Sequence, residues 1–148
     1  MYELDTLKSR LIKNTKYRVV DFLTVYWYKL EQYKKYQLRN CMSILAITKD
    51  NFQSDVINAT KPVFIDVYAT WCGPCQQMEP TIEALAQELG SKYVFGKVNV
   101  DESRDISIQL GITSVPTFVF FKDGQVVGKE TGYMSKDDLK DSLERFLG

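Results

Sequence analysis

The stretch "ATWCGPCQQMEP", residues 69–80, contains two of the chain's three cysteines, Cys72 and Cys75. Two residues separate them, and a tryptophan stands directly before the first. A pair with this spacing can belong to a zinc site, form a structural disulfide or act as a redox-active dithiol. The choice among these three depends on the rest of the sequence.

The composition is that of a globular protein without an overall charge bias. The 148 residues are 45% hydrophobic, and 19 basic side chains balance 19 acidic ones, so the net charge does not point to nucleic acid. The longest uncharged apolar run, residues 112–121, is too short to span a bilayer. The first residues lack the pattern of a secretory signal, so we expect a cytoplasmic protein, whose thiols are kept reduced.

The cysteine count narrows the role of the pair. The third cysteine is Cys41 and the chain has no histidine, whereas a tetrahedral zinc site needs four Cys or His ligands. Zinc is therefore disfavoured in a monomer, and we expect no metal or other cofactor. A disulfide across so short a separation would constrain little of the unfolded chain. A reactive dithiol is favoured, and two inert buried thiols remain the alternative.

The sequence changes character near residue 41. Residues 1–41 contain nine basic and four acidic side chains, whereas residues 42–148 contain ten basic and fifteen acidic ones, with all the glycines and prolines. We predict an N-terminal extension over 1–41 and a folded domain over 42–148. The extension has apolar residues at helical spacing: Val19, Leu23, Tyr26, Leu30 and Tyr33. An accessory helix, a flexible tail and a mis-assigned start before Met42 remain open.

The second part alternates between strand and helix patterns. Residues 62–69 are an apolar run typical of a strand buried on both faces, and helical spacing follows as far as Gly90. An Asp-Gly pair at 123–124 predicts a hairpin, and Ser135 with Asp138 predicts the start of the last helix. The remaining predicted elements are strands at 44–46 and 93–101 and helices at 49–56 and 103–111. This order predicts an α/β fold, a mixed sheet of about five strands with helices on both faces.

Three motifs give the domain a family resemblance. "WCGPC" stands at a strand-to-helix junction, "SVPT" (114–117) precedes the hairpin, and Gly132 follows its second strand. In these features residues 44–147 resemble thioredoxin. The resemblance implies the thioredoxin fold and a general protein-disulfide reductase, a monomer recharged by an NADPH-dependent thioredoxin reductase. A non-catalytic subunit clamp, or an exported or membrane-tethered oxidoreductase, are the competing hypotheses.

In thiol–disulfide exchange a thiolate attacks a sulfur of the client disulfide. Cys72 would open the helix, where unpaired N–H groups and the helix dipole favour a thiolate, so we expect it to be the exposed nucleophile. Cys75, one turn later, is expected to be more covered and to act as the resolving thiol. Gly73 and Pro74 between them would tune the redox properties of the pair.

Asp66 is an acid in the middle of the buried run "VFIDVYA". Burial would raise the pKa of its carboxyl group, unless strand alternation turns the side chain to solvent. The resemblance implies that Asp66 accepts and donates the proton of Cys75, with Lys97 as its charged partner. An ordinary edge lysine is the alternative for Lys97.

The resemblance also implies a client-binding rim around Cys72. Pro116 would be cis and lie beside the cysteines, and the rim would consist of Trp71, Gly73, Pro74, Val115 and Gly132. Trp71 and Val115 could instead simply pack in the interior. Two positions depart from the family pattern: Tyr68 replaces a common tryptophan, and Gln76 replaces a common lysine or arginine.

Overall fold

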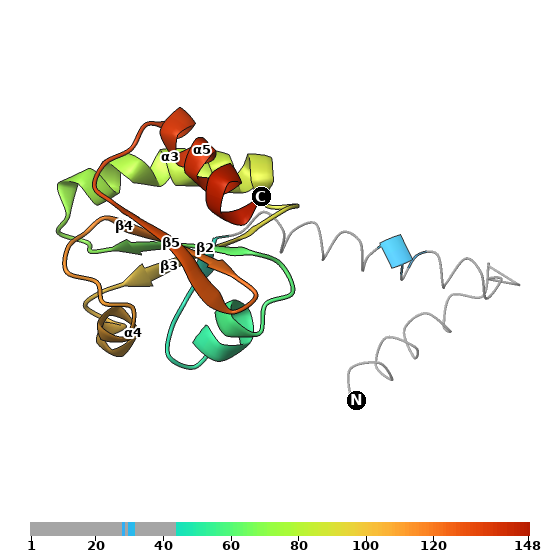
Figure 1. Ribbon diagram of the computed structural model, residues 1–148, viewed down its shortest axis with the longest axis horizontal. Coiled ribbons are helices and arrows are strands. Elements are labelled where there is room, and N and C mark those ends of the chain that lie inside the picture. Colours follow the sequence, from blue (N-terminus) through green and yellow to red (C-terminus); the bar gives the residue numbers. More distant parts are fainter. Residues whose placement is uncertain (1–27, 29, 32–43) are drawn as a thin grey trace, which may run out of the picture. The chain divides into compact units, whose positions relative to one another are not determined.

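The computed structural model describes residues 28, 30–31 and 44–148 (Figure 1). Cys41, most of the predicted N-terminal helix and the predicted boundary at 41/42 lie outside the described residues. Tyr28, Leu30 and Glu31 are helical. The boundary therefore stays a prediction.

The described residues form one five-stranded mixed sheet, as the sequence predicts. The strands lie in the order β1-β3-β2-β4-β5. Strands β1, β2 and β3 run parallel, β4 is antiparallel to β2, and β5 is antiparallel to β4. Their bounds are Leu45–Ala46, Val63–Tyr68, Val94–Asn99, Thr117–Lys122 and Gln125–Thr131. The central position of β2 explains why its sequence is almost continuously apolar.

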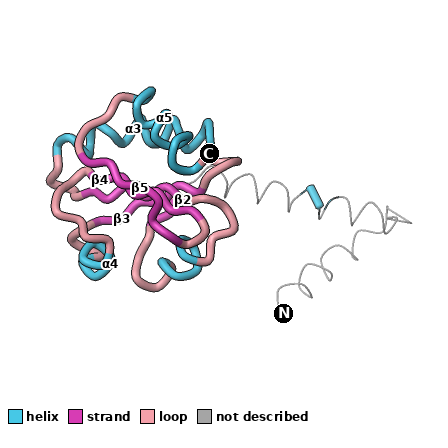
Figure 2. Tube along the Cα trace, in the orientation of Figure 1, coloured by secondary structure: helices cyan, strands magenta, loops and turns pink. Residues whose placement is uncertain are grey.

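Helices cover both faces of this sheet, which confirms the predicted layers (Figures 1 and 2). The elements are the π-helix η1, Gln53–Ile57, and the α-helices α3, Gly73–Leu89, α4, Arg104–Gln109, and α5, Lys136–Leu147. Helices α3 and α5 share a core with Phe64 and Phe120. Ile65 and Phe121 face the opposite core, with Phe52 and Ile106. Alternate residues of the central strands β2 and β4 thus contribute to two separate cores.

The helix predicted at 49–56 begins later than the sequence pattern indicates. Asn51 accepts a hydrogen bond from the Thr48 backbone N–H (2.7 Å) and donates its amide to the Ala46 carbonyl (2.9 Å). The Thr48 N–H precedes the first helical turn and has no partner within a helix, so Asn51 caps this turn and does not compete with it. The Thr48 and Asn51 carbonyls accept the N–H groups of Phe52 and Asp55 at 2.9 and 2.8 Å, and the regular helix that follows this capped turn is η1.

The predicted hairpin turn and the predicted start of the last helix are both present. Asp123 and Gly124 have positive φ angles of 53° and 74°, as a tight hairpin turn between β4 and β5 requires. Ser135 Oγ accepts the Asp138 N–H at 3.2 Å and begins α5. A bulge interrupts the hairpin, because Phe120 pairs with Gly128 and Phe121 with Val126, which leaves Val127 without an opposite residue.

Candidate active site

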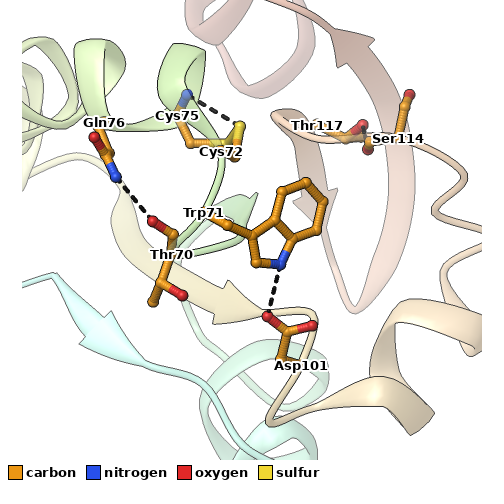
Figure 3. The surroundings of a disulfide bond; sticks show 8 residues. All are labelled: Thr70, Trp71, Cys72, Cys75, Gln76, Asp101, Ser114 and Thr117. Atoms are coloured by element: carbon orange, nitrogen blue, oxygen red, sulfur yellow. Dashed lines mark hydrogen bonds between the residues drawn. A yellow bond between two sulfur atoms is a disulfide. The ribbon is translucent and has the colours of Figure 1, made fainter.

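The cysteine pair lies where β2 ends and α3 begins. Cys72 is the N-cap of α3 and Cys75 is in the first turn, and the two form a disulfide with a Cα–Cα distance of 5.3 Å (Figure 3). Cys72 Sγ accepts a hydrogen bond from the Cys75 backbone N–H at 3.2 Å. Pro74 has no N–H, which costs nothing in the first helical turn. The helix thus presents its positive end to the Cys72 sulfur, an arrangement that favours a thiolate.

The expected difference in exposure between the two cysteines is wrong for this disulfide form. Cys72 and Cys75 each expose only 5% of their surface. Both pack in one small apolar cluster with Ala69 and with the partly buried Tyr68 and Val115. The bond holds the two sulfurs in the same surroundings, so the position along α3 distinguishes them, not the exposure.

Trp71 is exposed and fixed by a hydrogen bond. The residue is 70% accessible, and its indole Nε1 donates to Asp101 Oδ2 at 3.0 Å (Figure 3). Asp101 is a site residue that sequence reasoning missed. The available signal was its place just after β3, because the carboxyl ends of neighbouring parallel strands meet at one edge of a sheet.

The remaining predicted rim residues come from the same edge of the domain. The Val115–Pro116 peptide bond is cis, and Val115 packs against the cysteine cluster. Gly132, with φ of 100°, donates its N–H to the Pro116 carbonyl at 2.9 Å. Apart from the two chain neighbours of each glycine, no described residue has an atom within 4 Å of a Cβ placed at Gly73 or at Gly132. These glycines leave open space beside the disulfide, which a side chain would partly fill.

A cleft of about 620 Å³ lies on the Trp71 side of the disulfide. Its walls combine apolar and polar groups: Trp71, Val100, Asp101, Arg104, Ile108 and Val115. Ile108 is largely exposed, although it is apolar. Such a surface can hold an extended peptide segment next to the cysteines.

Gln76, one of the two departures from the family pattern, stabilises the start of α3 without contributing charge. Its Nε2 donates to the Thr70 carbonyl at 2.8 Å (Figure 3). The bond connects the first turn of α3 to the loop that carries Trp71. The neutral side chain therefore supports the shape of the site.

Asp66 is buried in β2, on the face covered by α3. Its residue exposure is 8%, and its Oδ1 is a fully buried side-chain oxygen without a hydrogen-bond partner among the described residues. Desolvation raises the pKa of Asp66 from 3.8 to about 7, against the opposing charge of Lys97 and with a smaller upward contribution from Glu79. A carboxyl group with this pKa can take or release a proton near neutral pH.

Asp66 shares a cavity of about 430 Å³ with Cys75, whereas Cys72 is not part of its lining. Lys97 and Glu79 also line this cavity. Lys97 is opposite Asp66 in the parallel register of β2 and β3. Its Nζ lies 3.7 Å from Glu79 Oε1 and 5.6 Å from the centre of the Tyr68 ring. The structure thus brings a thiol, a buried acid and an ion pair to one cavity.

Sequence reasoning missed Glu79. The available signal was its position four residues after Cys75, because residues i and i+4 of a helix lie on the same face. That rule places Glu79 near Cys75 but does not reveal its pairing with Lys97 on a strand.

The described residues provide neither a membrane-crossing helix nor a cluster of metal ligands. None of the helices in the described part of the chain combines the length and the apolar character that crossing a bilayer requires. No three His, Cys, Asp or Glu side chains of the described residues gather as a metal site.

Comparison with known proteins gives consistent matches over the folded part. The thioredoxin family model matches residues 43–145. A thioredoxin of Chlorobaculum thiosulfatiphilum is 38% identical over 101 residues, which cover 68% of this chain and 94% of the relative. One of Porphyra purpurea is 36% identical over 106 residues, 72% of this chain and 99% of the relative. One of Alicyclobacillus acidocaldarius is 40% identical over 103 residues, which cover 70% of this chain and 97% of the relative.

Proposed function

The chain belongs to the thioredoxin family of thiol–disulfide oxidoreductases, and we propose that Cys72 is the nucleophile and Cys75 the resolving cysteine of its protein-disulfide reductase reaction. The observation that supports this division is the N-cap position of Cys72, whose sulfur accepts the Cys75 N–H. The helix end stabilises negative charge on that sulfur. Gly73 and Pro74 would adjust the redox properties of the pair by keeping its turn compact.

The reaction transfers two electrons from the dithiol to the client. The Cys72 thiolate attacks one sulfur of the client disulfide, whose other sulfur leaves as a thiolate and takes up a proton. The Cys75 thiol then loses its proton and attacks Cys72 in the mixed disulfide. The second client sulfur leaves, and the Cys72–Cys75 disulfide forms. The client is reduced by the two electrons that the protein has lost.

Asp66 would accept the proton that Cys75 loses in the second step. Support comes from the shared cavity and from the raised pKa of this acid. Lys97, its neighbour on β3, would modulate the charge of the carboxylate.

Disulfide-containing client proteins would bind across the rim formed by Trp71, Gly73, Pro74, Val115 and Gly132. Support comes from the exposed indole, the open space at the glycines and the adjacent cleft. An NADPH-dependent thioredoxin reductase would recharge the disulfide, so the protein would carry electrons from NADPH and maintain thiol redox balance. A monomer in the cytoplasm suits this role, because a reducing compartment returns the pair to the dithiol.

The function is tested by a coupled insulin assay. With NADPH and thioredoxin reductase, the full chain should reduce insulin and consume NADPH, because the disulfide is regenerated in each cycle. The rate should rise with the concentration of the chain and exceed that of the reductase alone. Reduction driven by dithiothreitol but not by the reductase would contradict the proposed partner. Failure in both assays would contradict the proposed function.

Residues 42–148 are proposed to contain the whole catalytic unit, with residues 1–41 as an accessory extension. A chain starting at Met42 should fold and reduce insulin within about twofold of the full chain, because none of the proposed catalytic and client-binding residues precedes it. Circular dichroism and the coupled assay would measure both properties side by side. Loss of folding, or a much larger loss of activity, would show that the extension contributes to the domain.

A further inference from the structure

Glu79 gives the Asp66 cavity an acidic side chain that the proposed mechanism does not use. It projects from α3, one turn after Cys75, and 60% of its side chain remains accessible. We infer that Glu79 is a positioning residue, which holds the Lys97 ammonium group away from Asp66 and thereby favours the protonated form of Asp66. The inference rests on the proposed role of Asp66 as proton acceptor.

Lys97 makes its closest polar and aromatic contacts with groups other than Asp66. The strand register places Lys97 directly beside Asp66, so an ion pair between them would be the simple expectation. Lys97 Nζ instead makes its ion pair with Glu79 Oε1 at 3.7 Å and lies over the Tyr68 ring. Asp66 Oδ1 has no hydrogen-bond partner among the described residues. The cation next to the buried acid is thus engaged by two other groups.

Solvation explains why Lys97 favours this arrangement. Asp66 is almost fully buried, and an ammonium group that reached it would lose water. The Lys97 and Glu79 side chains are 37% and 60% accessible, so their pair forms without that penalty. The Tyr68 ring offers a second favourable contact for the cation. Without the Glu79 charge, the carboxylate of Asp66 would become the nearest anionic partner in the cavity.

The charged groups near Asp66 affect its pKa in the directions that this role of Glu79 requires. Burial has the largest effect and raises the pKa of Asp66; Lys97 opposes it and lowers this pKa, whereas Glu79 acts in the same direction as burial and raises it. The cavity is also lined by Cys75, which is uncharged in the disulfide with Cys72, and by the phenol of Tyr68. Glu79 is therefore the only negative charge at this cavity, among the described residues, that opposes ionisation of Asp66.

For the reaction, Glu79 would set the pH at which the resolving step begins. A protonated Asp66 cannot take the Cys75 proton, so the step accelerates as the pH rises through the pKa of Asp66. Glu79 raises that threshold by engaging Lys97. Removal of its charge should release Lys97 towards Asp66 and lower the threshold.

The test is an NMR titration of the Asp66 carboxyl carbon in the full chain. Glu79→Gln should lower the Asp66 midpoint by about half a unit or more, which is the effect expected for a partly exposed charge. In a Lys97→Met background the same change should produce less than half of that shift, because no cation remains to be released. Glu102→Gln, at an exposed acid without an ion pair in the described part of the chain, is the matched control and should leave the midpoint in place.

An unchanged midpoint in Glu79→Gln would overturn the inference. Equal shifts with and without Lys97 would also overturn it, because Glu79 would then act by its own charge alone. The pH midpoint of client release from the mixed disulfide should move in the same direction as the NMR midpoint. If Asp66→Asn released clients at the unmodified rate, the proposed role of Asp66 would fail, and the titration would still decide the placement of Lys97.

Discussion

Replacement of Cys72 by serine is expected to abolish insulin reduction, with a loss of at least about three orders of magnitude. The serine hydroxyl stays protonated at neutral pH even at the N-terminus of α3, so no competent nucleophile remains. Cys75→Ser should lose turnover as well but retain the first attack. It should therefore accumulate covalent complexes with clients through Cys72, which dissolve in dithiothreitol.

Non-reducing gel electrophoresis, with and without dithiothreitol, distinguishes the two variants. Each variant serves as the control of the other, because both remove one sulfur from the same helical turn. If Cys72→Ser trapped clients and Cys75→Ser did not, the roles of nucleophile and resolving cysteine would be reversed. Covalent complexes with both variants would mean that the position in α3 does not assign the roles.

Asp66→Asn is expected to stabilise the protein at neutral and alkaline pH. Burial raises the pKa of Asp66 to about 7 from 3.8. Between these two values the folded state retains a proton that the unfolded chain has released, so the free energy of unfolding falls as the pH rises through this window. Above pH 7 the ionised acid costs about 2–4 kcal/mol. Asparagine avoids this cost, and the gain should be nearly absent at pH 4.

Urea unfolding at pH 4 and pH 8 measures this gain. Asp50→Asn, at an exposed aspartate in the turn before η1, is the matched control and should change stability little at either pH. The Asp66 variant should also release clients from the mixed disulfide at least about tenfold more slowly at pH 7, since it lacks the proton acceptor. An equal gain in stability at both pH values would mean that packing, rather than ionisation, explains the effect.

Much of the fold could be predicted because its signals are local. The apolar run of β2, the helical spacing of α3 and the Asp123-Gly124 turn each determine their own element within a few residues. The π-helical form of η1 could not be predicted, because the bond from the Asn58 N–H to the Gln53 carbonyl at 2.9 Å depends on backbone geometry that composition does not reveal.

The candidate site, like the fold, could be predicted from the sequence only in part. The cysteine spacing and the acid in a buried run were visible in the sequence as unusual local features. The partners of these residues were not, because Trp71 and Asp101 are thirty residues apart and meet only where β2 and β3 end. The pairing of Lys97 with Glu79 likewise depends on how α3 lies over the sheet.

The outer strands of the sheet have a consequence for a protein-disulfide reductase. Strand β1 has two residues, and β5 is bent by the bulge at Val127 and carries Lys129 and Glu130. Short, bulged and charged edges are poor templates for further strand pairing. Both margins of the sheet therefore discourage an extended chain from adding itself as a sixth strand, which protects the protein from co-aggregation with the polypeptides it reduces.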